Sequence, residues 1–445
     1  MAREGISRGV GFWGMVGAVM VALKLKERYD EYSTVPGDEE GLGQGPVALR
    51  DPNLDEDATD GASFLDTQLP SGRPKRQQKR DCCMCCGLRC GLFWKAFGIV
   101  LLLFVGWQAL KLALWAVKPK PTGLENMPEF SKSLGCFNTP HLYKGGKQVI
   151  SVPVGQNKNK GDHSLDFRGS AVGTILLAQG EADLTDIKYE LTLGSELASI
   201  IDKVILDYPT QDEIEENMKS SRLQLVLPSK TPENADFCTR FDVTIYLPPA
   251  VKTLHIQSHV TTQIKFDPDS NVNLDALYVT MYSLNQNNML LPTEGVHAKK
   301  LKLQMTRGWL VGDVTVVDHA ELVTQSGDAT TNVHVHPAPS SAEPPAPVTL
   351  LTTTGAGRSD VFFVNHPGFP HRPIDATHHS SLNGDLYLTY TDARFDGPVD
   401  LSAKSFSATG LENAFKKDGG LPFHGSRDGA DKMLVKSQGW VGLYF

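Results

Sequence analysis

The chain has 445 residues, of which 40% are hydrophobic and 21% are charged, so it is long enough for a sizeable folded core together with polar tails. Its formal net charge at pH 7 is -8, and this excess of acidic groups gives no support for a nucleic acid as a partner. The composition changes sharply along the chain, which predicts separate segments rather than one uniform domain.

Residues 1–95 are predicted to form a mostly disordered tail. Its acidic part, residues 27–66, contains twelve Asp or Glu, two Arg and no Lys. So few large apolar side chains cannot offset the entropy of ordering the chain. Residues 73–95 reverse the charge, because seven Lys or Arg accompany a single acidic residue, Asp81. This second part is called the collar below.

A short apolar stretch, Val10 to Leu23, precedes the acidic part. It follows Arg3 and Arg8 and resembles the hydrophobic region of a signal peptide, but no small-x-small cleavage site occurs before Lys24. Fourteen residues are short for a membrane span. The pattern favours an interfacial helix or an ordinary N-terminus. A signal or a second membrane segment remains the alternative, and it would reverse the topology.

Residues 96–117 predict a transmembrane helix. Gln108 and Lys111 are the only strongly polar side chains among these 22 residues. A helix of this length extends about 33 Å, enough to cross a hydrocarbon layer of about 30 Å. Trp94 and Trp115 lie where the two membrane interfaces would be. The lipid bilayer is therefore the first predicted partner.

The charges that flank this helix predict its orientation. The collar carries seven Lys or Arg just before it, whereas Lys118, Lys120 and Lys132 follow it. Positive charge gathers on the cytoplasmic side, so residues 1–95 are predicted to be cytoplasmic. The chain is then a single-pass type II membrane protein. Residues 118–445 would be extracellular at the plasma membrane or lumenal in an endomembrane.

Five of the seven cysteines lie in the collar, next to the predicted span. A reducing cytoplasm disfavours disulfides. A structural zinc site usually pairs two groups of ligands across a longer loop, and no second group of this kind and no His lies nearby. Thiols beside basic residues and a membrane span favour reversible S-palmitoylation, and a metal site stays open as the alternative. The lipidation candidates are Cys82, Cys83, Cys85, Cys86 and Cys90.

The other two cysteines, Cys136 and Cys238, both follow the span. A pair of cysteines in an oxidising compartment predicts one disulfide, which would close a loop of about 100 residues. Two unrelated buried thiols are the alternative. The division of the cysteines agrees with the topology that the charges predict.

Residues 118–135 predict a Pro-rich stalk, and residues 136–445 predict a mainly β ectodomain. Alternation of apolar and polar residues is clear from Arg240 to Phe266, where Phe241, Val243 and Ile245 share one face. The strongest helical candidate, Thr210 to Ser221, is short and polar.

A degenerate repeat runs through the rest of the chain. Segments with a short apolar strand, then Ser, Thr or Gln, then a small residue begin at residues 254, 277, 301, 322, 350, 386, 405 and 434. Stacked coils of an irregular single-stranded β-solenoid produce this pattern, and a β-sandwich is the alternative. Residues 336–347 and 365–384 are predicted as loops. Five glycines are predicted corners with positive φ: Gly308, Gly327, Gly355, Gly410 and Gly439.

Several of these segments carry a family resemblance. "DVTIYLP" followed by "LHIQSHVTTQI", then "LVTQSGDATTNVHV" and "LLTTTGAGRSDVFFV", resembles adhesin-type domains of unknown function that fold as single-stranded β-solenoids. The ending "KSQGWVGLYF" and the order of tail, span and domain are similar to uncharacterised fungal membrane proteins. The resemblance covers residues 240–445 well. It implies a fold and a display role, and no catalytic residues.

Candidate chemistry in the ectodomain is sparse. His334 and His336 are two residues apart on a predicted strand, so they share a face and form a weak candidate for a metal-chelating pair. His366, His371, His378 and His379 follow in a predicted loop. Four aspartates, Asp313, Asp328, Asp360 and Asp396, would form a carboxylate ladder if they stacked, although solvated turn aspartates are commoner. No phosphate-binding loop or nucleophile motif occurs, so no cofactor and no catalytic residue is predicted.

Three functions remain open on the sequence. The first, which we favour, is a non-enzymatic display module that binds a cell-wall glycan or a surface protein. The second is a membrane-anchored enzyme acting on polysaccharides, for which acidic and basic side chains should converge in one cleft. The third is a sorting or scaffold protein that acts through its cytoplasmic tail, where "YSTV" at Tyr32 matches a short endocytic signal.

Overall fold

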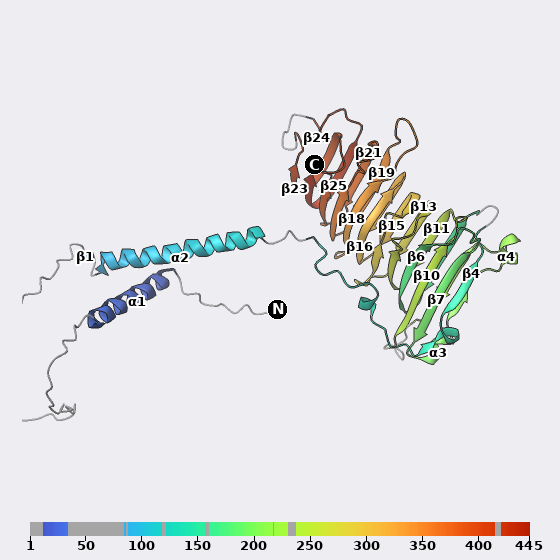
Figure 1. Cartoon of the computed structure of the whole chain (residues 1–445), viewed down its shortest axis with the longest axis horizontal. Coiled ribbons are helices and arrows are strands. Elements are labelled where there is room, and N and C mark those ends of the chain that lie inside the picture. Colours follow the sequence, from blue (N-terminus) through green and yellow to red (C-terminus); the bar gives the residue numbers. More distant parts are fainter. Residues whose placement is uncertain are drawn as a thin grey trace, which may run out of the picture. The chain divides into compact units, whose positions relative to one another are not determined.

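The computed structural model describes residues 12–33, 84–85, 88–117, 122–155, 160–216, 218–229, 237–413 and 420–445. The chain divides into two compact units, Met1–Lys120 and Pro121–Phe445 (Figure 1). The described part of the first unit is mostly helical, and the second unit is built mainly from β-strands. The prediction of a mainly β chain with few helices and one long apolar helix is confirmed.

The first unit contains helix α1 (Phe12–Ser33), strands β1 (Met84–Cys85) and β2 (Leu88–Arg89), and helix α2 (Cys90–Val117). Strands β1 and β2 pair in antiparallel fashion. Val16 of α1 packs with Ala96 and Val100 of α2. Glu27 to Ser33, predicted within the acidic tail, instead end α1. The rest of that acidic part and most of the collar lie outside the described residues.

Helix α2 contains the predicted membrane span. Its stretch Phe93–Leu114 has a mean hydropathy of 2.0, and only 6% of its most apolar window is buried. Within the described ranges it is the one helix long and apolar enough to cross a membrane. The span predicted at residues 96–117 therefore falls inside this helix, by length and composition.

The second unit begins with short helices and eight strands that close one end of the sheet. The helices are η1 (Lys132–Leu134), η2 (Tyr143–Gly145), α3 (Ala198–Ile201) and α4 (Gln211–Glu215). The strands are β3 (His141–Leu142), β4 (Gln148–Val152), β5 (Asp162–Arg168), β6 (Val172–Gln179), β7 (Ile187–Ser195), β8 (Ile205–Asp207), β9 (Arg222–Val226) and β10 (Thr239–Leu247). Strand β7 runs antiparallel to β3, β4 and β10, whereas β5 and β6 pair in parallel with later strands.

The remaining strands follow in order along the chain. They are β11 (Thr253–Ser258), β12 (Thr261–Phe266), β13 (Val272–Met281), β14 (Met289–Leu291), β15 (Val296–Met305), β16 (Trp309–Val316), β17 (His319–Thr324), β18 (Thr330–Pro337), β19 (Val348–Thr354), β20 (Arg358–Phe363), β21 (Ile374–Ser380), β22 (Asp385–Thr389), β23 (Gly397–Thr409), β24 (Phe423–His424) and β25 (Lys432–Tyr444). Figure 1 shows them as a succession of aligned strands from green to red.

From β11 to β20, each strand pairs in parallel with the strand two positions later. Two interleaved series result. The odd series runs from β5 through β11, β13, β15, β17 and β19 to β21, and the even series runs from β6 through β12, β14, β16, β18 and β20 to β22. Strand β25 joins both, because its first part pairs with β21 and its last part with β22.

The register places side chains of the same type next to one another in successive strands. Leu254 lies opposite Leu277, and Leu277 opposite Leu301. All three are buried, as are most alternate residues along these strands. Each fully buried leucine stabilises the folded chain by about 1.5–3 kcal/mol relative to exposure. The inward rows therefore form one continuous core, and the alternate rows face outward.

Two details of the predicted repeat are wrong. In the odd series Ala320, not Leu322, lies between Leu301 and Leu350, so the segment at 322 is shifted by two residues. Residues 365–384, predicted as a loop, contain strand β21. Its inward residues include Ala376 and His378 in place of large apolar side chains, which hid the strand from a search for apolar alternation.

The structural reason for glycine differs among the five predicted corner positions. Gly308 and Gly410 have positive φ angles of 129° and 78°, as predicted. Gly355 and Gly439 do not, but an added Cβ would lie 2.2 Å from the carbonyl oxygen of Gln325 and 2.4 Å from that of Gly384, respectively. Close stacking of backbones, rather than φ, requires glycine there. Gly327 has neither constraint, so its prediction as a positive-φ corner is wrong.

Residues 122–135, predicted as part of the stalk, lie along the outward face of the even series. Asn332 of β18 donates to the carbonyl oxygen of Thr122 at 3.0 Å, and Gln263 of β12 donates to Ser133 Oγ at 2.8 Å. Arg240 of β10 donates to the carbonyl oxygen of Gly135 at 3.0 Å. The strap formed by residues 122–135 explains why Gln263 and Asn332, which face outward, are nevertheless buried.

Candidate functional site

The two histidines predicted as a chelating pair lie on strand β18 of the even series. His334 and His336 alternate with the buried Val333 and Val335, so both side chains are on the outward face. The neighbouring strand β16 places Asp313 directly opposite His334. Ionisable groups from two strands therefore meet on this face.

Glu294 reaches the same place from the turn between β14 and β15. The hydroxyl of Thr315 donates to the carbonyl oxygen of Glu294 at 2.8 Å, and the backbone N–H of Asp313 donates to that of Pro292 at 3.2 Å. Gly312 permits this approach, because its φ is 144° and an added Cβ would lie 2.3 Å from the Pro292 oxygen. The turn is thereby held against β16.

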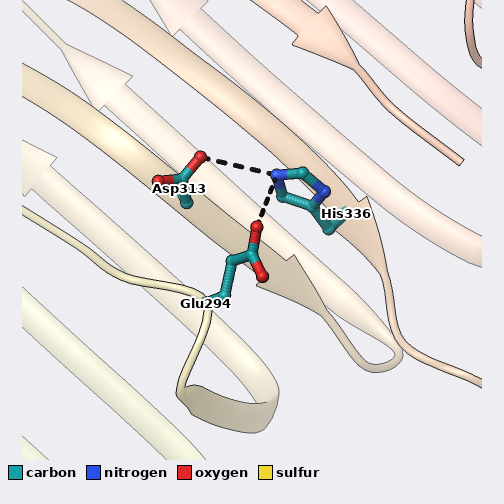
Figure 2. Close-up of side chains that lie close together, drawn as sticks. All are labelled: Glu294, Asp313 and His336. Atoms are coloured by element: carbon teal, nitrogen blue, oxygen red, sulfur yellow. Dashed lines mark ion pairs between the residues drawn. The ribbon is translucent and has the colours of Figure 1, made fainter. Parts of the chain in front are cut away.

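These three residues, Glu294, Asp313 and His336, are called the carboxylate–histidine cluster. Nε2 of His336 lies 3.3 Å from Oε1 of Glu294 and 3.5 Å from Oδ1 of Asp313 (Figure 2). One ligand atom from each residue lies within 4.8 Å of the other two. The side chains of Glu294 and Asp313 are 65% and 46% exposed, so the cluster opens to solvent. Its three ligand atoms are close enough together to hold a metal ion.

His334 has a different environment. Its ring stacks on Phe362 with centroids 4.9 Å apart, and its Nδ1 lies 3.7 Å from Oδ1 of Asp313. It does not belong to the group of three close ligand atoms. The spacing in the sequence thus pointed to the right strand, but the partners of His336 are two carboxylates that lie 23 and 42 residues earlier in the chain.

The four aspartates considered as a ladder do not stack. Asp313 lies opposite His334, and Asp360 lies opposite Asn332 on one side and Tyr387 on the other. Asp328 follows β17 and pairs with Arg307. Like charges in one stacked row would repel one another, and the register avoids this.

The four later histidines are also dispersed. His378 is completely buried in β21, whereas His379, the next residue, is exposed. Nε2 of His371 lies 3.0 Å from both carboxylate oxygens of the buried Asp431. His366 stacks against Phe369 in the preceding turn. They therefore do not form one His-rich metal site in the structure.

A hollow on the outward face of the odd series is a second candidate surface. Its volume is about 700 Å³. The ring of His255 stacks on that of Tyr278 with centroids 4.8 Å apart, because the register places them opposite each other. The lining consists of Thr253, His255, Asp275, Ala276, Tyr278, Lys299, Lys300, Asp318 and His319.

Charges of both signs line this hollow. Nζ of Lys299 lies 2.8 Å from Oδ1 of Asp275. The hydrogen bond between them lowers the pKa of the Asp275 carboxyl and raises the pKa of the Lys299 amine. Both groups are therefore charged at neutral pH. A shallow surface with an aromatic pair and fixed charges is suited to binding a polar ligand.

Two buried histidines have hydroxyl partners on both ring nitrogens: His163, which sequence reasoning missed, and His378, which it placed in a loop. In the first, Nδ1 of His163 lies 2.7 Å from the hydroxyl of Ser221, and its Nε2 is hydrogen-bonded to the hydroxyl of Tyr189. Burial lowers the pKa of His163 to about 3 and raises the pKa of Tyr189. This histidine is therefore neutral in the folded protein at pH 7.

The second group repeats this arrangement near the other end of the sheet. Nδ1 of His378 lies 2.7 Å from the hydroxyl of Thr352, and its Nε2 lies 2.7 Å from that of Tyr390. Burial again lowers the pKa of the histidine to about 3. Both groups are enclosed in the core, so we assign them to stability. Both histidines occupy inward positions of strands whose residues alternate between buried and more exposed. A polar residue at such a position is the sequence signal that could have identified them.

The two cysteines of the second unit form a disulfide in the structure. Cys136 and Cys238 are 102 residues apart, and their Cα atoms lie 5.6 Å apart. The bond joins the end of the strap to the start of β10. Of the lipidation candidates, Cys82, Cys83 and Cys86 lie outside the described residues, whereas Cys85 ends β1 and Cys90 begins α2.

Comparison with known proteins gives distant likenesses. No family model and no curated protein matches the chain. Similar solved structures include a "putative cell adhesion protein" from Clostridium sporogenes, with 13% identity and a TM-score of 0.21, covering 67% of this chain and 98% of that chain. A "putative adhesin" from Parabacteroides distasonis has 11% identity and a TM-score of 0.33, with coverages of 67% and 95%.

A "putative lipid binding protein" from Parabacteroides distasonis has 8% identity and a TM-score of 0.22, with coverages of 68% and 98%. All three TM-scores are below 0.5, so we base no inference about this chain on these likenesses. The three proteins are bacterial, and the fungal origin implied by the sequence resemblance stays a prediction.

Proposed function

We propose that this chain is a single-pass type II membrane protein that displays a β-solenoid for non-enzymatic binding of a glycan or a surface protein. The observation that carries the binding proposal is the hollow on the odd series, where the stacked His255 and Tyr278 lie beside Lys300 and His319. An aromatic face contacts the apolar face of a sugar ring, and the charged groups hydrogen-bond to its substituents.

The solenoid is proposed from the strand pairing. Each coil would contribute one strand to the odd series and one to the even series, since strands two positions apart pair in parallel. Leu254, Leu277 and Leu301 recur at one position of successive coils, 23 and 24 residues apart. Strands in a sheet lie about 4.8 Å apart, so each coil would lengthen the stack by that amount.

A test of the binding proposal uses the full chain in lipid nanodiscs on an array of neutral and acidic glycans. Tyr278→Ala should lose most of the bound signal, because it removes one half of the stacked pair. Tyr246→Ala is the matched control: Tyr246 is also half-buried and lies against Lys188, away from the hollow. Equal binding by the two variants would show that the hollow is not the binding surface.

The enzyme alternative is favoured by one observation, the presence of acidic and basic groups in the same hollow. Against it, the lowered pKa of Asp275 suits a stable ion pair more than a general acid. Each glycan that binds should therefore be assayed for new reducing ends after prolonged incubation. Product formation that Asp275→Asn abolishes would replace the binding proposal with a polysaccharide-acting enzyme.

The topology proposal places residues 1–95 in the cytoplasm and residues 118–445 outside the cell or in the lumen of an endomembrane. It is supported by the excess of positive charge before α2 and by the disulfide, since disulfides persist in oxidising compartments. In sealed vesicles with the cytoplasmic side outward, protease should digest the tail and spare the large domain. Digestion of the large domain instead would contradict the orientation.

Within this topology we propose that the collar cysteines are S-palmitoylated. Their position beside basic residues and a membrane helix supports this. Hydroxylamine-sensitive acyl labelling should be present in the wild type and absent when Cys82, Cys83, Cys85, Cys86 and Cys90 are changed to Ser. Equal labelling of both proteins would exclude the modification.

A further inference from the structure

The carboxylate–histidine cluster leaves a buried nitrogen without a hydrogen-bond partner. Nε2 of His336 is shielded from solvent, and no hydrogen bond to it forms among the described residues. A buried polar atom of this kind costs about 1–3 kcal/mol unless something satisfies it. Two carboxylate oxygens lie near this atom, but at 3.3 and 3.5 Å they do not meet hydrogen-bond geometry.

The same distances fit a shared cation. Zinc bonds to histidine nitrogen and carboxylate oxygen at about 2.0–2.2 Å, so two ligand atoms of a tetrahedral ion lie about 3.3–3.5 Å apart. Oε1 of Glu294 and Oδ1 of Asp313 are at such distances from Nε2 of His336. The three ligand atoms also lie within 4.8 Å of one another, which small side-chain rotations can close.

The backbone around the cluster is fixed. Asp313 and His336 lie on adjacent, paired strands, and the hydrogen bond from Thr315 holds the turn that carries Glu294. The Glu294 side chain, which is 65% exposed, has the most freedom to adjust, and that of Asp313 is 46% exposed. Because the backbone already brings the three ligands together, only side-chain rotations are needed to bind an ion.

The donor set selects among cations. One imidazole nitrogen with two carboxylate oxygens suits zinc and other first-row transition metals, whereas calcium and magnesium prefer six or more oxygen ligands. Two carboxylates also give the site a formal charge of -2 when the imidazole is neutral. The solvent-exposed side of the cluster leaves room for water at the remaining coordination position.

We propose that Glu294, Asp313 and His336 bind a divalent transition-metal ion, with zinc as the representative, through one atom each. His334 is not a ligand, because its ring stacks on Phe362 and lies outside the close group. The site is independent of the hollow that carries the binding proposal, since it lies on the even series and the hollow lies on the odd series.

The experiment measures zinc bound per chain by equilibrium dialysis with Zn²⁺ as the only added ligand. It uses the full chain in detergent, with the five collar cysteines changed to Ser in every protein so that thiols do not bind the metal. His336→Gln should bind one zinc ion fewer than this parent or bind it at least about tenfold more weakly. Asp313→Asn should weaken binding in the same way.

Two control variants make the result specific. His297→Gln changes a half-buried histidine on β15 that makes no ion pair among the described residues, so it should bind zinc like the parent. His334→Gln should also retain binding. Equal zinc binding by the parent and His336→Gln would overturn the proposal, and the cluster would then be a surface contact that binds no metal.

Thermal unfolding separates loss of metal from loss of fold. Without zinc, His336→Gln should unfold within a few degrees of the parent, because His336 lies on the outward face of the sheet and its Nε2 has no hydrogen bond to lose. Saturating zinc should raise the unfolding temperature of the parent and leave that of His336→Gln unchanged. An equal rise in both proteins would contradict the assignment of the site.

Discussion

The two ends of the second unit solve the same problem in different ways. A stack of parallel strands presents unpaired backbone groups at both ends, which invites pairing with another chain. The N-terminal end is closed by antiparallel strands around β7 and by the Cys136–Cys238 disulfide. The C-terminal end is closed by the long strand β25, which joins both series, and by β23 beside it.

The C-terminal end has a buried carboxylate where the N-terminal end has a covalent bond. Asp431 is completely buried and accepts hydrogen bonds from the backbone N–H groups of Ile374 at 2.8 Å and Asp396 at 2.6 Å. His371 approaches the same carboxylate at 3.0 Å. Both ends also contain a buried histidine with two hydroxyl partners. One end therefore depends on redox conditions and the other on polar contacts, while the stability of both depends on pH.

The largest expected effect is loss of stability in acid, at both ends. Burial lowers the pKa of His163 and His378 to about 3 in the folded protein, from 6.5. Below pH 6.5 the unfolded chain therefore binds protons that the folded chain does not. Stability is full above that pH and falls towards pH 3, by about 1.4 kcal/mol per pH unit for each histidine.

Urea unfolding of the full chain at several pH values measures this slope. His163→Gln and His378→Gln should each reduce the slope of unfolding free energy against pH by about 1.4 kcal/mol per pH unit, because each removes one titrating group. His297→Gln, at a half-buried position, should leave this slope unchanged. A slope unchanged in both glutamine variants would mean that the buried histidines do not control acid unfolding.

The next largest effect is expected from the disulfide. Changing Cys136 and Cys238 to Ser removes a cross-link over 102 residues, and the chain-entropy model predicts a loss of at most about 4.7 kcal/mol. Hydrogen exchange should accelerate in β7 and β10 and remain unchanged in β21 and β25. Faster exchange at the C-terminal end instead would contradict the assignment of the disulfide's stabilising effect to the N-terminal end.

Asp431→Ala is the corresponding change at the C-terminal end. The buried N–H of Ile374 and the part-buried N–H of Asp396 lose their acceptor, at about 1–3 kcal/mol each, so the free energy of unfolding should fall by about 2–6 kcal/mol. Hydrogen exchange should accelerate near Ile374 and Asp396. Asp428→Ala is the matched control, because Asp428 is exposed nearby and should have little effect.

The smallest effect is expected from the tyrosine hydroxyls. Tyr189→Phe and Tyr390→Phe each leave one nitrogen of a buried histidine without a partner, which should cost about 1–3 kcal/mol. Tyr278→Phe is the control, since its partly exposed ring stacks on His255. Chemical denaturation of the three variants compares them directly, and similar losses in all three would remove the special role of the buried pairs.

The sequence was informative where a local pattern reports a local property. Apolar content and length predicted the long apolar helix, and alternation predicted buried Phe241, Val243 and Ile245 on one face of β10. The pattern failed for β21, where His378 and Ser380 occupy inward positions. Their burial is possible because the hydroxyl of Thr352 on β19 and the carbonyl oxygen of Gly384 in the turn after β21 supply partners, which alternation of apolar residues does not reveal.

By itself, the sequence determined the order of a polar tail, an apolar helix and a mainly β unit, because composition and alternation act over a few residues. The tertiary structure decided which distant residues meet. It placed Glu294 and Asp313 beside His336, separated His334 from that group and covered the even series with the strap. Such contacts depend on strand register and turn geometry, which bring together residues that no short pattern relates.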